Sequence, residues 1–183
     1  MVDRRRNLWP LPGGHDGYAI AVHQMLDAAK DKPNVSVFQD RVYNLFPQVR
    51  SVSTARGYAG VLIALGLTQR LPAGRVDLTQ AGQAFLRTND LGILRAALMD
   101  RIFGVRELLV VVAERSMAFP EAQEVLADRG VHWTSPMALR YRIWWLRAAG
   151  AIEAHRRNRA DWLQLTPAGK ALVRQSTDEA IWH

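Results

Sequence analysis

Apolar residues recur at three- and four-residue steps along much of the chain, with polar residues between them. This spacing is typical of helices that bury one face. In residues 51–66 the apolar positions are Ala55, Tyr58, Leu62 and Leu65. The pattern predicts a helix whose opposite face stays in solvent.

The pattern changes after this helix. Gly66 stands where a glycine can end a helix in the left-handed conformation. A short strand, a tip at residues 71–75 that contains Pro and Gly, and a returning strand with Val76 and Leu78 are expected next. Thr79 then takes the place of an N-cap for another short helix.

The same order recurs later in the chain. Aligning Gly66 with Gly150 places residues 51–86 beside residues 135–173 and puts Arg56 opposite Arg140. Both copies resume as Leu-Thr-x-Ala-Gly, and the second copy is three residues longer before this motif. An internal repeat of this kind indicates two similar supersecondary units.

Two further helical patterns precede each copy. They lie at residues 17–29 and 37–46 before the first copy, and at 91–115 and 120–128 before the second. The pattern at 91–115 is expected to form two helices that meet near Gly104. The predicted order is therefore helix, helix, helix, hairpin, helix, stated twice.

This order, with Ala-Leu-Gly-Leu at residues 64–67 followed by a hairpin and the threonine motif, resembles the winged-helix DNA-binding domains of bacterial regulators. The resemblance implies a mainly α fold with small β-hairpin wings (α+β) and two winged-helix units in tandem. The expected boundaries are a basic N-terminal arm at 1–16, unit 1 at 17–89, unit 2 at 90–177 and a C-terminal tail at 178–183.

The positive net charge of the chain favours a polyanionic partner. The 183 residues carry a net charge of +7, with 21 Arg against 3 Lys. A positive field attracts nucleic acid, and the guanidinium group can grip a phosphate or a guanine edge with two hydrogen bonds. An arginine bias of the source genome would produce the same excess, so the positions of the arginines must decide.

Enzymatic chemistry is not expected of this chain alone. It has no cysteine, and its histidines are not spaced as metal ligands. The glycines at 11–17 lack the Lys-Ser/Thr of a phosphate loop. Carboxylate pairs such as Glu121 and Glu124 look like surface charge. We expect no catalytic residue, no metal and no cofactor, although the chain could be part of a larger enzyme.

DNA contacts are expected from the third helix of each unit, whose N-terminal half reaches base edges in a helix-turn-helix, and from the wing. The candidates in unit 1 are Ser53, Thr54, Arg56 and Arg75. The candidates in unit 2 are Ser135, Arg140, Tyr141, Arg142, Trp144, Arg156, Arg157 and Arg159. Because its wing is the densest basic cluster, unit 2 is expected to supply more of the affinity. The arginines at 4–6 could form a minor-groove arm.

Three functions remain open. The first is double-stranded DNA binding, either as a transcription regulator or, preferably, as the targeting module of a larger enzyme. In outline the chain is similar to winged-helix modules of restriction enzymes, and no regulatory domain is evident after unit 2. The second is a protein–protein scaffold in a chromosome or assembly complex. The third is a repressor that dimerises through residues 91–115, although this segment is better interpreted as the core joining the units.

These functions imply a set of partners and a location. The expected partner is double-stranded DNA, with a homodimer or a fused or associated catalytic domain as further possibilities. The apolar runs are too short to cross a membrane, so no membrane partner is expected. The predicted location is the cytoplasm, in association with the nucleoid.

Overall fold

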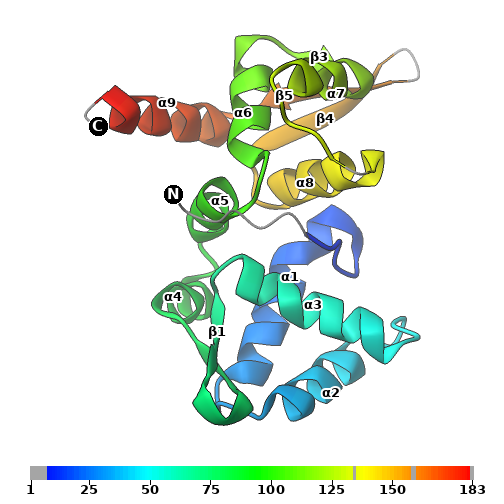
Figure 1. The fold of residues 1–183 in the computed structure, drawn as a ribbon, viewed down its shortest axis with the longest axis vertical. Coiled ribbons are helices and arrows are strands. Elements are labelled where there is room, and N and C mark those ends of the chain that lie inside the picture. The colour runs from blue at the N-terminus through cyan, green and yellow to red at the C-terminus, as the bar shows by residue number, and fades with distance from the viewer. Residues whose placement is uncertain (1–7, 134, 158–159, 182–183) are drawn as a thin grey trace.

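The computed structural model describes residues 8–133, 135–157 and 160–181 (Figure 1). The protein is mainly helical with small antiparallel sheets, which confirms the α+β class. The first half contains α1 (Gly14–Ala29), α2 (Val35–Leu45), α3 (Val52–Ala64), β1 (Thr68–Leu71), the short η1 (Pro72–Gly74), β2 (Arg75–Leu78) and α4 (Gln80–Thr88).

The second half repeats this order with additions. It contains α5 (Leu91–Arg101), α6 (Val105–Glu114), β3 (Met117–Ala118), α7 (Phe119–Asp128), α8 (Pro136–Ala148), β4 (Ile152–Arg157), β5 (Ala160–Leu165) and α9 (Pro167–Ile181). As expected, two helices meet near Gly104, which takes a φ of 78° immediately before α6. In both halves a helix is followed by an antiparallel hairpin and a closing helix.

The threonine motif closes both halves with equivalent hydrogen bonds. The Thr79 backbone N–H donates to Leu67 O at 3.0 Å, and the Thr79 hydroxyl donates to Gly66 O at 2.6 Å. The same hydroxyl accepts from Gly82 N–H at 3.1 Å and so caps α4. Thr166 makes the matching contacts with Ala151 O, Gly150 O and Gly169 N–H at 3.1, 2.7 and 3.0 Å.

The motif ends in glycine because the backbone approaches closely there. A Cβ added to Gly82 would lie 2.0 Å from Leu67 O, and one added to Gly169 would lie 2.1 Å from Ala151 O. No side chain tolerates such a distance, so the closing helix packs against the hairpin only through glycine. The equivalence of the two halves therefore extends to individual atoms.

Small strand contacts extend the repeat beyond what the sequence indicated. β3 pairs with β5 and lies immediately before α7. In the first half an isolated bridge joins Asn34, immediately before α2, to Arg75 of β2. Both contacts are too short to leave an alternating pattern. They make α1 and α6 equivalent and leave α5 as an extra helix between the two halves.

The boundaries at both ends differ from the predictions. α1 begins at Gly14, and Leu8 and Leu11 are buried, so the basic arm cannot extend to residue 16. At the other end α9 continues to Ile181, past the expected start of the tail at 178. The N-terminal segment from Leu8 onward is therefore part of the packed structure.

The two halves share one hydrophobic core. The ring of Tyr18 in α1 lies 4.9 Å from that of Trp145 in α8, and burial raises the pKa of Tyr18 to about 12 against an opposing backbone hydrogen bond with Leu11. The Trp145 indole N–H donates to Trp9 O at 2.8 Å. The most apolar part of segment 91–115 is also buried within the chain, in agreement with the core interpretation. No described helix has both the length and the apolarity to cross a membrane.

Candidate nucleic-acid interface

α3 presents a polar face of small residues and one arginine. The Ser51 hydroxyl caps the helix by accepting from Thr54 N–H at 3.2 Å. Ser53, Arg56 and Gly60 are exposed and lie at three- and four-residue steps, so they share one helical face. We call these three residues the α3 free face. A Cβ added to Gly60 would meet nothing within 4 Å, so packing within the chain does not require a glycine there.

α8 presents the equivalent positions with larger side chains. Ser135 caps the helix by accepting from Met137 N–H at 3.2 Å. Met137, Arg140 and Trp144 align with Ser53, Arg56 and Gly60, and we call them the α8 free face. Met137 is 39% exposed, and the other two are partly exposed. Neither α3 nor α8 contains an acidic residue.

The arginines of the first half are uncommitted. Arg56 and Arg70 of β1 line the same shallow groove between α2, α3 and the hairpin. Both side chains are exposed, as is Arg75 of β2. Within the described part of the chain, none of the three makes a side-chain hydrogen bond or ion pair. Their guanidinium groups are therefore available to an outside anion.

In the second half Arg140 stacks on an aromatic ring. Its guanidinium lies 4.9 Å from the ring centroid of Phe119 in α7, a contact that fixes the side chain without neutralising its charge. Tyr141 and Trp144 lie close together, with ring centroids 5.7 Å apart. The free face of α8 is thus cationic and aromatic, whereas that of α3 is cationic and small.

Arg142 was expected to flank the DNA-contacting surface, and the structure contradicts this. Its side chain is fully buried. Nε donates to Phe103 O at 2.7 Å and Nη1 to Ala138 O at 2.6 Å, and the guanidinium lies 5.2 Å from the Trp133 ring centroid. Its charge is used inside the fold, where it joins α8 to the turn between α5 and α6.

The hairpin of β4 and β5 has less free positive charge than its sequence suggests. Arg156 and Asp161 are opposite each other in the hairpin, and Arg156 Nη1 donates to Asp161 Oδ1 at 3.2 Å. Arg157 lies 5.5 Å from the Trp162 ring centroid. Arg159 and the arginines at 4–6 lie outside the described residues. The greater affinity of unit 2 stays a prediction.

Two arginines elsewhere are committed to carboxylates. Arg41 donates to Asp31 at 2.6 and 2.9 Å, and Arg129 donates to Glu114 at 2.9 and 2.7 Å. These hydrogen bonds hold the pKa of both carboxyls below the ordinary values. Asp31 lies in the turn before α2, which carries Arg41, and Glu114 ends α6, whereas Arg129 directly follows α7. Both pairs therefore tie neighbouring segments together, and their guanidinium groups are committed within the fold.

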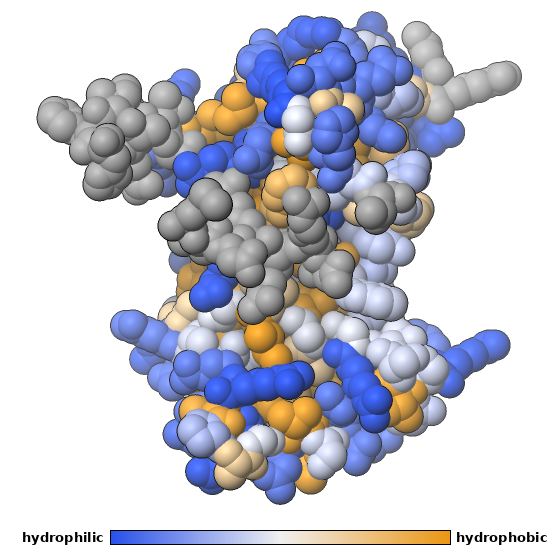
Figure 2. Space-filling view, viewed as in Figure 1, coloured by the Kyte–Doolittle hydropathy of each residue, from blue (hydrophilic) through white to orange (hydrophobic). Residues whose placement is uncertain are grey.

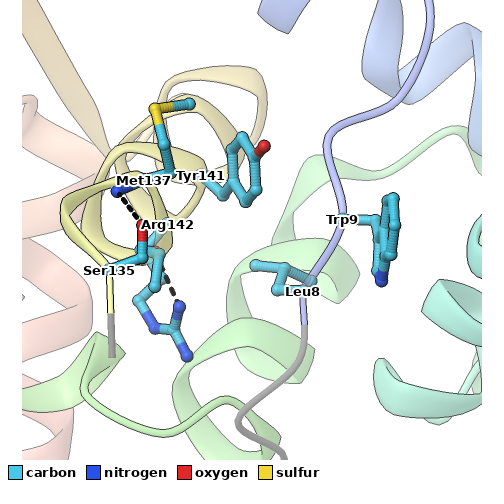
Figure 3. A pocket seen from close by; sticks show the side chains of 7 residues that line it. Leu8, Trp9, Ser135, Met137, Tyr141 and Arg142 are labelled. Carbon is cyan, nitrogen blue, oxygen red and sulfur yellow. Dashed lines mark hydrogen bonds between the residues drawn. The ribbon is translucent and has the colours of Figure 1, made fainter. Parts of the chain in front are cut away.

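A cavity of about 360 Å³ opens beside the N-terminal half of α8. It is lined by Leu8, Trp9, Ser135, Met137, Ala138, Tyr141 and Arg142. Figure 3 shows Leu8 and Tyr141 pointing into the gap between the N-terminal segment and α8, with the Trp9 ring turned away. No local pattern of the sequence indicates this cavity, because residues 8 and 9 meet α8 only in the folded chain.

The remaining surface offers little other chemistry. On the face shown in Figure 2, apolar side chains form small separate patches among hydrophilic ones. Within the described residues no group of three or more His, Asp or Glu side chains is placed to hold a metal ion.

Comparisons with known proteins support the fold. No protein family model matches the chain, and no curated protein matches it. The structure of the restriction endonuclease FokI is similar, with a TM-score of 0.51 and 13% sequence identity. The similarity covers 82% of this chain and 35% of the endonuclease chain, so this protein spans about a third of that length. At this identity the likeness concerns the fold.

Proposed function

We propose that this protein binds double-stranded DNA through two winged-helix units in tandem, with α3 and α8 as the helices that enter the major groove. The observation that carries the proposal is the pair of equivalent free faces. Each has an arginine at the same position, Arg56 or Arg140, and neither helix has an acidic residue.

The environment of these arginines supports the proposal. A phosphate diester is attracted to a guanidinium whose charge is not already neutralised. Within the described residues neither Arg56 nor Arg140 has an ion pair, and Arg140 lies over the ring face of Phe119. A scaffold function would need an exposed apolar patch. On the face shown in Figure 2 the apolar side chains are dispersed, so this face offers no such patch.

We further propose that the chain acts as the DNA-targeting module of a larger enzyme and does not itself cleave DNA. FokI, the structure with a similar fold, is a restriction endonuclease, and the similarity covers only 35% of its chain. A free transcription regulator remains the alternative, and an isolated chain that cleaves DNA would contradict the proposal.

Fluorescence anisotropy with a random-sequence duplex of about 25 base pairs, at two salt concentrations, tests DNA binding. The variants are Arg56→Ala, Arg140→Ala and the double substitution. If each arginine contacts a phosphate, the double variant binds about tenfold or more weakly, and its log–log salt slope falls by about 2.

Arg87→Ala is the matched control. Arg87 is an exposed arginine of α4, outside both free faces and both hairpins, and its loss removes the same charge. If Arg87→Ala weakens DNA binding as much as Arg140→Ala does, the loss of affinity reflects net charge alone and not the position of Arg140. Absence of binding by the wild-type protein at low salt would refute the proposed function.

A further inference from the structure

We propose that the cavity beside α8 receives a single nucleobase turned out of the duplex. This proposal rests on the proposed function, because it requires DNA on the α8 free face. The position of the cavity is the first argument. Met137 belongs both to the free face and to the cavity wall. A base that leaves the stack next to Met137 would therefore meet the opening directly.

The size and chemistry of the cavity suit one ring system. A volume of about 360 Å³ is at the lower end of the range for small-molecule pockets, which is about 300–1,000 Å³. Leu8, Met137 and the Tyr141 ring provide apolar surface, and Ser135 and Arg142 add polar groups to the lining. A nucleobase has the same division, with apolar faces and a polar rim, and enzymes that read extruded bases hold them between aromatic and apolar side chains.

The first half shows that the fold does not require such a cavity. Tyr141 aligns with Gly57, and Met137 aligns with Ser53. At Gly57 the indole of Trp9 covers the helix, since a Cβ added there would lie 3.2 Å from the Trp9 ring. Trp9 therefore covers Gly57 of α3. The equivalent position in α8 is left open, and its Tyr141 ring forms a wall of the cavity.

Trp144 is a large apolar side chain that could fill the space left in the duplex by an extruded base. It lies on the α8 free face, beside Tyr141, with ring centroids 5.7 Å apart. Removing a base from the stack leaves a gap, and side chains that enter base steps are large and apolar. Trp144 is placed to occupy the gap while Tyr141 holds the base.

The test compares three duplexes of equal length that bind the full chain. One is fully paired, one has a central thymine opposite an abasic site, and one has abasic sites on both strands. The thymine duplex has already lost its base pair, so it binds more tightly than the paired duplex by roughly five- to a hundredfold, the range expected for one base stacked on an aromatic ring. The doubly abasic duplex is equally deformable but has no base to capture.

Variants locate the effect. Tyr141→Ala removes the wall, and Ala138→Leu fills the cavity while keeping Tyr141; both are expected to abolish the preference for the thymine duplex. Ala138→Leu changes no predicted DNA contact, so it is expected to leave binding to the paired duplex intact. Tyr141→Phe keeps the ring and the preference. Tyr43→Ala, which removes an exposed tyrosine of α2, is the control and leaves the preference unchanged.

Each other outcome overturns the proposal. An equal preference for the doubly abasic duplex would mean that the protein selects deformable DNA. Equal binding to all three duplexes would refute base capture and leave the proposed function intact. Absence of binding to any duplex would refute DNA binding itself, and base capture with it.

Discussion

α3 and α8 have equivalent places in their halves, yet they offer different surfaces to a partner. Gly57 and Gly60 of α3 align with Tyr141 and Trp144 of α8. The α3 free face is flat and allows close approach of a backbone, whereas the α8 free face carries bulky rings next to a cavity. The two helices thus keep an arginine at the same position but differ in the size and shape of the side chains around it.

The two hairpins differ in how many arginines they contain and in how much of that charge is free. The first has few arginines, but Arg70 and Arg75 are unpaired within the described structure. The second has more, but Arg156 is paired with Asp161 and Arg157 stacks on Trp162. The number of basic residues is therefore a poor measure of available charge, and the predictions below separate the shared features from those that differ.

The largest effect is expected where the halves are alike. Gly82→Ala and Gly169→Ala each force a Cβ against a carbonyl oxygen, so each should lower the free energy of unfolding by about 3 kcal/mol. Urea denaturation followed by circular dichroism measures the change. A loss below about 1 kcal/mol at only one of the two sites would show that the two closing motifs are not equivalent.

Arg142→Ala and Arg140→Ala should separate folding from binding. Arg142→Ala removes a fully buried guanidinium that donates to the carbonyls of Phe103 and Ala138, which should cost about 2–3 kcal/mol of unfolding free energy. Arg140→Ala should change the unfolding free energy by no more than about 0.5 kcal/mol and weaken DNA binding. Urea denaturation measures the unfolding free energy of the two variants, and fluorescence anisotropy on the same samples measures their DNA affinity. The reverse pattern would contradict the assignment of Arg142 to the interior.

Gly60→Ala tests why α3 has a glycine on its free face. Alanine has open space at this position and favours the helix, so it should raise the free energy of unfolding by about 0.5–1 kcal/mol. If DNA approaches α3 closely, the same variant binds DNA more weakly. Unchanged affinity in the anisotropy assay would argue against close approach.

The smallest effect on DNA affinity is expected at the hairpin of β4 and β5. Asp161→Asn removes the carboxylate that neutralises Arg156, and it should raise DNA affinity about twofold at low salt, because exposed ion pairs are worth little. The gain should disappear at high salt. Asp128→Asn, which removes one exposed negative charge from α7, is the control. Equal gains from both variants would exclude a role specific to the hairpin.

The sequence predicted the helices, the hairpins and the closing motifs well because each has a local signal. Arg142 shows where residue type misleads. It lies three residues after Leu139 and four before Leu146, so helical spacing already places it on the buried face, but an arginine favours an outward assignment. The cavity, the position of Leu8 and the edge strands depend on contacts between distant segments, and no local pattern encodes them.

The hydrogen bond from Trp145 to Trp9 joins residues that are 136 positions apart in the chain. A ribosome that adds about 5–20 residues per second needs roughly 7–27 s to extend the chain across that interval. During this time Leu8, which lines the cavity beside α8, has no neighbour from that helix. Closure of this contact therefore waits for the second half, and translation speed sets how long the nascent chain remains without it.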